Sequence, residues 1–202
     1  MKENNLGLSR RELVFAAVAL PAMSWGGAFN VFAASGEFQP TPECRDPDDP
    51  TPAQTPGPFF KPRSPQRTSF LEEKTRGDRI VLEGRVLSTR CTPIARALLD
   101  FWHADASGAY DNAGYQFRGH QFTDEQGRYR LETIVPGIYP GRTRHFHVRA
   151  QAPGGRMLTT QLYFPGEAEN KRDGLFDPKL LVSLRESAGL KLASFHFVLS
   201  VS

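Results

Sequence analysis

Cysteine is scarce in this sequence, whose 202 residues include only Cys44 and Cys91. Neither lies near a histidine in the sequence, which argues against a metal site built from thiolates. In an oxidising compartment the two could pair, and in the simple chain-entropy picture the disulfide would stabilise the fold by roughly 4 kcal/mol. We expect this disulfide, with two unpaired thiols as the alternative.

Excess charge of one sign is also lacking. The 25 Lys and Arg residues are nearly balanced by 22 Asp and Glu residues, which gives a formal net charge of +3. Nucleic acids and anionic membrane surfaces attract proteins mainly through concentrated basic charge. The composition therefore indicates neither nucleic acid nor anionic lipid as a partner.

The composition leaves little room for long helices. With 16 Pro, 18 Gly and 15 Phe residues, the sequence favours many short strands joined by tight turns. Its length is that of about one domain, and its hydrophobic fraction of 39% suffices for one ordinary core. An all-β fold is predicted.

The first part of the sequence does not fit that fold. Arg10 and Arg11 precede an uncharged stretch over residues 13–36, in which Ala33 and Ala34 mark a plausible cleavage position. This pattern is typical of a twin-arginine export signal, here residues 1–34. An uncleaved membrane anchor is the alternative, but the stretch is only moderately apolar. We expect a periplasmic or otherwise exported protein without stable membrane association after cleavage.

A proline-rich arm is predicted over residues 35–77. Nine of the sixteen prolines lie between residues 40 and 65, and proline fixes its own φ and lacks the donor that helices and central strands need. The arm should therefore lie extended on the surface of the domain. Phe59 and Phe60 need cover there, and they either wall a pocket or simply pack.

Residues 78–202 are predicted to form an antiparallel β-sandwich. Short β-like runs alternate with turn signals, and seven strands at this spacing are typical of a sandwich. Residues 166–189 break the pattern and should form an irregular loop with one short helix. The expected strands are DRIVLEGRVL, ALLDFWHAD, YQFRGHQFTD, RYRLETIV, RHFHVRAQA, MLTTQLYFP and SFHFVLSV.

Two histidines stand close together in the expected strand RHFHVRAQA. Strand alternation points His145 and His147 to one face and Phe146 and Val148 to the other. The two histidine Cα atoms would then be roughly 7 Å apart, so both imidazoles could bind one ion. A solvated strand face that happens to carry two histidines is the alternative.

Two tyrosines lie in glycine-containing turns beside strands. Tyr139 stands in a Pro-Gly-x-Tyr-Pro turn before the histidine strand, and Tyr110 stands in a Gly-x-Tyr turn after another strand. A trivalent cation can lower the pKa of a phenol from about 10 to below neutrality. Two phenolates and two neutral imidazoles would suit ferric iron better than zinc or copper. Half-buried packing with a hydrogen-bonded hydroxyl is the usual alternative for tyrosine.

Several motifs resemble the intradiol ring-cleavage dioxygenases, the family that contains protocatechuate 3,4-dioxygenase and catechol 1,2-dioxygenase. They occur in the family's order between about Ile80 and Gly166, and TPAQTPGPFF upstream looks like the family's entry segment. The resemblance implies a prealbumin-like sandwich of the aromatic-compound dioxygenase type. The motifs are DFWHADASGAYDN, FRGHQFTDEQGRYRLETIVPGIYPGRTRHFHV and TTQLYFPGE.

The resemblance also implies chemistry: a non-haem Fe(III) enzyme that cleaves a catechol-type ring with O2 to a muconate-type diacid. By the family's spacing, Arg142 rather than Arg144 would stabilise charge on the ring, together with Gln161. Tyr139 would also take up a proton from the substrate. The implied metal ligands are Tyr110, Tyr139, His145 and His147.

Other features fall outside this motif set. His103 and His120 match no ligand position and are expected to have structural or surface roles, and Trp102 is expected in the core. The connection from Tyr139 to His145 is shorter than in well-known members, and the helical dimerisation segment of the catechol 1,2-dioxygenases is missing. The choice of catechol and the assembly of a homo-oligomer therefore stay open.

Two other function classes compete with this interpretation. A non-catalytic prealbumin-like binding module would share the sandwich but would have no use for four convergent ligands. An exported copper or zinc β-sandwich enzyme would need more histidines and an acidic partner, and the sequence has five histidines. Bound iron and a red-brown colour would distinguish the dioxygenase from both.

Overall fold

The computed structural model describes residues 49–187 and 189–201. The predicted export signal and Cys44 lie outside the described residues, so the signal and the disulfide with Cys91 stay predictions. No helix in the described part of the chain is long and apolar enough to cross a membrane. The elements are β1 (Arg79–Ser88), β2 (Leu98–Trp102), β3 (Arg118–Phe122), β4 (Arg128–Ile134), β5 (His145–Gln151), β6 (Leu158–Tyr163), the 3₁₀ helices η1 (Ala168–Lys171) and η2 (Pro178–Leu180), β7 (Ser183–Ser187), β8 (Leu190–Ser194) and β9 (Phe197–Leu199).

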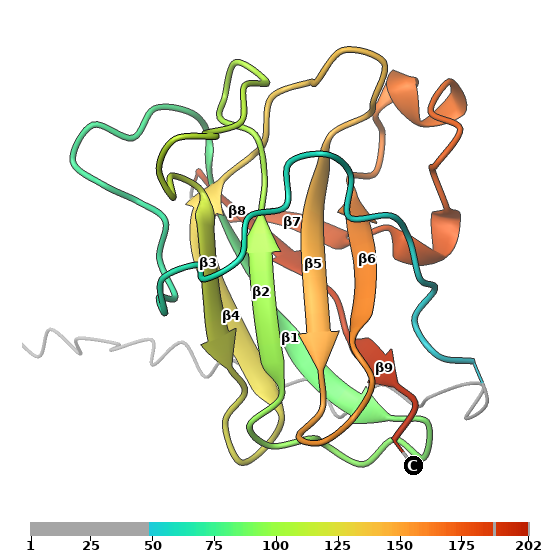
Figure 1. Ribbon diagram of the computed structural model, residues 1–202. Helices are drawn as coiled ribbons and strands as arrows, with labels where there is room; N and C mark the ends of the chain where they lie inside the picture. Colours follow the sequence, from blue (N-terminus) through green and yellow to red (C-terminus); the bar gives the residue numbers. More distant parts are fainter. Residues whose placement is uncertain (1–48, 188, 202) are drawn as a thin grey trace, which may run out of the picture. The chain divides into compact units, whose positions relative to one another are not determined.

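The strands form two sheets that lie face to face (Figure 1). The first has the order β3-β2-β5-β6 and is antiparallel throughout. The second has the order β4-β1-β8-β7, and β9 also pairs with β1. The predicted all-β sandwich is confirmed, but the second sheet is mixed because β8 and β9 both run parallel to β1. These two strands follow each other in the same direction, interrupted at Phe195 and His196, and pair with successive parts of β1.

The segment 166–189 differs from its prediction. It contains two 3₁₀ helices where one short helix is expected, and it also contains β7, which forms an antiparallel hairpin with β8. Every residue of β7 is exposed. A strand without buried positions has none of the alternation by which strands are recognised in a sequence, so β7 could not be found by its pattern.

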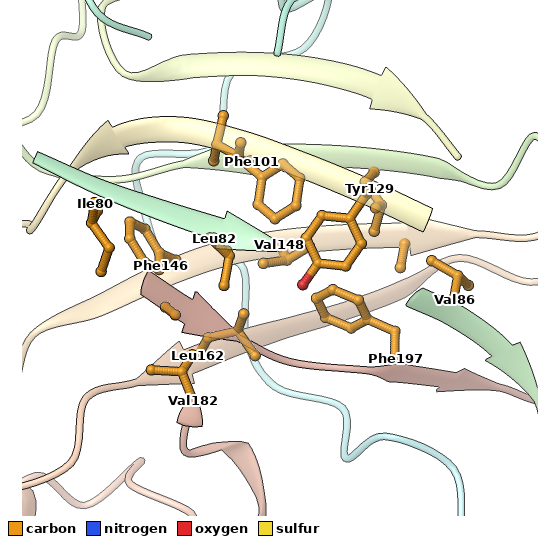
Figure 2. Close-up of a cluster of buried hydrophobic side chains, with 14 of the residues drawn as sticks. Ile80, Leu82, Val86, Phe101, Tyr129, Phe146, Val148, Leu162, Val182 and Phe197 are labelled. Atoms are coloured by element: carbon orange, nitrogen blue, oxygen red, sulfur yellow. The ribbon is translucent and has the colours of Figure 1, made fainter. Parts of the chain in front are cut away.

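The core lies between the two sheets and follows the alternation expected for β5. Phe146 and Val148 are fully buried there. Figure 2 shows them among side chains from both sheets, including Phe101, Tyr129 and Phe197. The hydroxyl of Tyr129 donates to the carbonyl of Phe195 at 2.9 Å, which satisfies the polar end of a ring that is otherwise buried among apolar groups.

The arm covers the outer face of the first sheet, as Figure 1 shows for the cyan-to-teal segment. It pairs with the edge strand β6, where the Gln54 backbone N–H donates to the Thr159 carbonyl at 2.7 Å. It pairs with the opposite edge strand β3, where the Arg67 N–H donates to the His120 carbonyl at 2.9 Å. The described part of the arm is therefore extended, as predicted, and side chains on the outer face of this sheet lie between the sheet and the arm.

His103 follows β2 and has the structural role expected of it. Its Nδ1 lies 2.7 Å from the Ala104 carbonyl and its Nε2 lies 2.7 Å from the Thr133 hydroxyl. Because a carbonyl only accepts, Nδ1 carries the hydrogen and Nε2 accepts from Thr133. Burial lowers the pKa of His103 to about 3, so the imidazole is neutral in the folded protein at ordinary pH.

This histidine makes stability depend on pH. The folded-state pKa is below the unfolded value of about 6.5, so between these pH values the unfolded chain binds a proton that the folded chain does not. Stability therefore falls as the pH falls, and at pH 4 His103 should lower the free energy of unfolding by about 3 kcal/mol relative to pH 7. Urea unfolding of metal-stripped His103→Gln and wild type should show a shallower pH dependence in the variant. Equal slopes would contradict this prediction.

Candidate active site

His145 and His147 lie on the outer face of β5, beneath the arm. Both are buried, with 4% and 2% of their surfaces exposed, because the arm covers this face. Their Nε2 atoms are 3.1 Å apart. Nδ1 of His145 lies 2.7 Å from the Thr143 carbonyl, so it carries the hydrogen and Nε2 keeps its lone pair. The predicted convergence of the two imidazoles is present in the structure.

Both histidines are held in the neutral form. Burial lowers the pKa of His145 to about 4. Burial also lowers the pKa of His147 far below its usual value, helped by His145 and by the positive charge of Arg142. Neutral imidazole is the form that binds metals, so neither side chain needs to lose a proton before it can act as a ligand at neutral pH.

Tyr110 brings a phenol to the same point. Its hydroxyl oxygen lies 3.3 Å from Nε2 of His145, and its ring is 5.9 Å from that of Tyr139. Burial raises the pKa of Tyr110, and the charge of Arg142 opposes this effect. The hydroxyl of Tyr139 makes no hydrogen bond with the described residues, and its half-buried ring packs edge-on against Phe59 at 5.3 Å.

Two glycines set the positions of the tyrosines. The turn that carries Tyr110 and the turn that carries Tyr139 touch backbone to backbone, since a Cβ on Gly108 would lie 2.1 Å from the Ile138 carbonyl oxygen. A Cβ on Gly137 would lie 2.3 Å from the Gly108 nitrogen. Only glycine permits this approach. The glycine beside each tyrosine is thus the local reason that both rings meet above β5.

A row of side chains forms the base of the site. Strand pairing aligns one residue from each strand of the first sheet, and the Trp102 ring stacks on the His147 ring with centroids 4.9 Å apart. Trp102 is buried, as expected of a core residue, but it packs against the arm on the outer face of this sheet and lies outside the cluster between the two sheets. The row consists of Arg118, Trp102, His147 and Gln161.

The arm closes the site from above. Gly57 has φ +64°, and a Cβ there would come within 3.3 Å of Cε1 of His147. Phe59 stacks on Tyr110 with ring centroids 4.3 Å apart, and Phe60 packs edge-on against Trp102 at 5.1 Å. Both phenylalanines of the arm therefore pack against the site: Phe59 lies against both tyrosines, and Phe60 lies over Trp102 in its base.

Arg142 and Gln161 adjoin this cluster. Nη2 of Arg142 donates to Oε1 of Gln161 at 2.6 Å, and Nε2 of Gln161 donates to the Thr55 carbonyl at 2.9 Å. Arg144 points elsewhere: its Nη1 donates to the Pro136 carbonyl at 2.7 Å and its Nε pairs with Glu167 at 3.1 Å. The structure therefore places Arg142, and not Arg144, beside Gln161.

The donor set fits a trivalent iron. Two nitrogens bound at about 2.1 Å to one ion, at right angles, are about 3 Å apart, so the observed 3.1 Å suits two ligands of one ion. No three His, Cys, Asp or Glu side chains within residues 49–187 and 189–201 could hold a metal ion together. A metal here would therefore depend on the tyrosine oxygens, which favour a hard, oxidised cation over zinc or copper(I).

Comparison with known proteins gives the family. A family model described as "Dioxygenase" matches residues 56–199. The protocatechuate 3,4-dioxygenase beta chain of Burkholderia cepacia is 36% identical over 118 residues, 50% of each chain. Catechol 1,2-dioxygenase of Acinetobacter guillouiae is 29% identical, over 66% of this chain and 55% of that protein. The chain thus spans about half the length of the curated relatives it matches.

Solved structures agree with these matches. The dioxygenase domain of a dioxygenase carbohydrate-binding protein fusion from Streptomyces sp. SirexAA-E is 55% identical, with a TM-score of 0.75 over 76% of this chain and 100% of that one. The 3-chlorocatechol 1,2-dioxygenase of Rhodococcus opacus 1CP is 32% identical, with a TM-score of 0.70 over 75% of this chain and 73% of that one. This chain therefore belongs to the intradiol ring-cleavage dioxygenase family.

Proposed function

We propose that this chain uses O2 to cleave the ring of a catechol-type substrate between its two hydroxylated carbons, giving a muconate-type diacid. The observation that carries the proposal is the meeting of His145, His147 and Tyr110 at one buried point beside Arg142. Family membership supports the same reaction, because the relatives are named protocatechuate 3,4-dioxygenase and catechol 1,2-dioxygenase.

The proposed cofactor is non-haem Fe(III), and its ligands would be Tyr110, Tyr139, His145 and His147. When bound, it would withdraw electron density from the substrate and make the ring reactive toward O2. The support lies in the chain itself: two neutral imidazoles face one point, the Tyr110 hydroxyl oxygen lies 3.3 Å from one of them, and the Tyr139 ring lies 5.9 Å from the Tyr110 ring. Phenol oxygens together with imidazoles make a donor set suited to ferric iron.

Tyr139 is the proposed proton acceptor among these residues. Its hydroxyl has no hydrogen-bond partner among the described residues, whereas Tyr110 contacts His145 and is covered by Phe59. The hydroxyl of Tyr139 is therefore less constrained by contacts than the hydroxyl of Tyr110. As a phenolate, its oxygen would accept the proton that a catechol hydroxyl gives up on binding.

Arg142 and Gln161 would stabilise the negative charge that develops on the ring. A positive group that is already in position costs no reorganisation when the charge appears. Gln161 is fully buried and fixed at both ends of its amide by Arg142 and Thr55. The guanidinium is the charged member of the pair, so most of the stabilisation would come from Arg142.

Export is part of the proposal. Arg10 and Arg11 before the uncharged stretch support the twin-arginine route. That route carries folded proteins, which suits a chain that must acquire its metal before it leaves the cytoplasm. Fractionation of producing cells would then find the mature chain outside the cytoplasm, and a wholly cytoplasmic chain would contradict this part of the proposal.

Oxygen uptake tests the function. Purified protein loaded with iron should consume about one O2 per ring cleaved when it is given catechol, protocatechuate, chlorocatechol or hydroxyquinol. Product analysis should identify a ring-opened diacid for at least one of them. A colourless protein that holds no iron and consumes no oxygen would instead favour a binding module, while copper or zinc in stoichiometric amount would favour the other class of enzyme.

A further inference from the structure

Asp173 is a buried carboxylate that pairs with Arg142, and it has no role in the reaction proposed above. It lies in the irregular segment after η1, and its side chain is 2% exposed. Both of its carboxylate oxygens accept from Nε of Arg142, at 3.1 and 2.9 Å. The backbone N–H groups of Thr143 and Leu175 each donate to this carboxylate at 2.9 Å. Asp173 therefore has a fixed position relative to Arg142.

The carboxylate of Asp173 is ionised. Burial by itself raises the pKa of Asp173, but the hydrogen bonds from Leu175, Thr143 and Arg142 outweigh it, and the pKa is lowered. The contact with Arg142 is therefore an ion pair. It is well shielded, because the Arg142 side chain is 17% exposed and that of Asp173 is almost fully buried. A shielded, hydrogen-bonded pair restrains its partners more than a surface pair does.

Asp173 and Gln161 bind different nitrogens of Arg142. Nε of Arg142 donates to the Asp173 carboxylate at 2.9 Å, and Nη2 donates to Oε1 of Gln161 at 2.6 Å. A planar guanidinium held through two of its nitrogens has a defined orientation. Its third nitrogen, Nη1, makes no hydrogen bond with the described residues. The charge of Arg142 is close enough to oppose the rise that burial causes in the pKa of Tyr110 and to add to the fall that burial causes in the pKa of His147. This orientation is therefore set beside the candidate iron ligands.

We propose that Asp173 is a positioning residue, which fixes the Arg142 guanidinium in the orientation that ring cleavage requires. The inference rests on the proposed function for its kinetic consequence. Its structural part, the restraint of Arg142 by Asp173, stands independently of any activity. A charged group displaced by about 1 Å can lose about 100-fold in rate, so the effect should be large although Asp173 itself touches no substrate.

The first test is kinetic. Asp173→Asn should keep the iron content and colour of wild type, because no candidate ligand is altered. Its kcat should fall by about 100-fold while KM changes by less than about threefold, since Arg142 acts on charge that develops during the reaction. In an Arg142→Ala background the same substitution should have no further effect on kcat, because Asp173 acts only through that arginine.

The second test observes Arg142 directly and needs no activity. In ¹H–¹⁵N spectra of the metal-stripped protein, the Nε–H signal of Arg142 can be assigned by its loss in Arg142→Lys. In wild type, Asp173 should shield the Nε–H hydrogen of Arg142 from water. In Asp173→Asn the same hydrogen should exchange with water at least about tenfold faster.

Asn170→Ala is the matched control. Asn170 lies in η1, accepts from the Thr143 hydroxyl at 2.7 Å and donates to the Phe164 carbonyl at 2.9 Å. Its removal loosens the same segment without touching Arg142, so kcat and the Arg142 signal should stay near wild type. The proposal is overturned if this control matches Asp173→Asn, if Asp173→Asn loses its iron, or if Asp173→Asn retains the wild-type Arg142 signal. An inactive wild type with the shielded signal would count against the proposed function alone.

Discussion

His147→Ala is expected to lose bound iron and, with it, all oxygen uptake. His147 directs Nε2 at Nε2 of His145 from 3.1 Å, and stacking on Trp102 fixes its ring. Alanine would remove one of the four candidate ligands, and the described part of the chain holds no group of three His, Cys, Asp or Glu side chains that could bind the ion instead. Loss of an outer partner typically lowers metal affinity 10- to 100-fold, so loss of a ligand should lower it by more than about 100-fold. Metal analysis and the red-brown absorption of the purified variant, measured beside wild type, check this.

His120→Ala is the control for that experiment. His120 lies on β3, and its Nδ1 contacts Ser64 of the arm. The substitution removes an imidazole from the same sheet but none from the candidate ligand set, so iron and colour should stay. Retention of full iron by His147→Ala would show that the ligand set is wrong. Equal loss in both variants would mean that the sheet and arm, and not the ligand, determine iron binding.

Arg142→Ala is expected to keep its iron and colour but to lose turnover. The side chain contacts Asp173 and Gln161, and its charge acts on the tyrosine and histidine cluster without being a ligand. Loss of one positioned donor to a developing negative charge typically costs about 100- to 1,000-fold in kcat. Steady-state oxygen uptake, normalised to the iron content of each preparation, measures the effect.

Arg144→Ala provides the matched comparison. Arg144 is two residues away in the chain but binds the Pro136 carbonyl and Glu167. Its replacement should change kcat by less than about threefold, as is usual away from the reacting groups. If Arg142→Ala keeps full turnover, Arg142 has no part in the mechanism. An equal loss in both variants would attribute the effect to the turn before β5 as a whole.

Strand β5 shows how much of the site could be predicted from the sequence. The alternation in His145–Gln151 places Phe146 and Val148 in the core and both histidines on the opposite face, and the structure has this arrangement. A period of two follows from strand geometry alone, so no tertiary information was needed. The burial of the histidines could not be predicted from this alternation, because it depends on an arm that lies about ninety residues away in the sequence.

Asp173 shows what the sequence could not reveal. It lies in a segment without strand or helix periodicity, and its role comes entirely from a contact with Arg142, 31 residues earlier. Trp102 presents a similar case: its apolar character predicts the observed burial, but only the path of the arm decides that it lies beneath Phe60 and not in the cluster between the two sheets. Local patterns specify strands and turns, whereas contacts between distant irregular segments have no local signal.

The position of iron in crystals of the loaded protein, found by anomalous scattering at the iron absorption edge, would show whether the four candidate ligands bind one ion. One peak is expected at about 2.1 Å from Nε2 of both His145 and His147. The hydroxyl oxygens of Tyr110 and Tyr139 should lie within bonding distance of the same peak. No peak between these four side chains, or an iron atom bound by other residues, would show that they do not form the metal site.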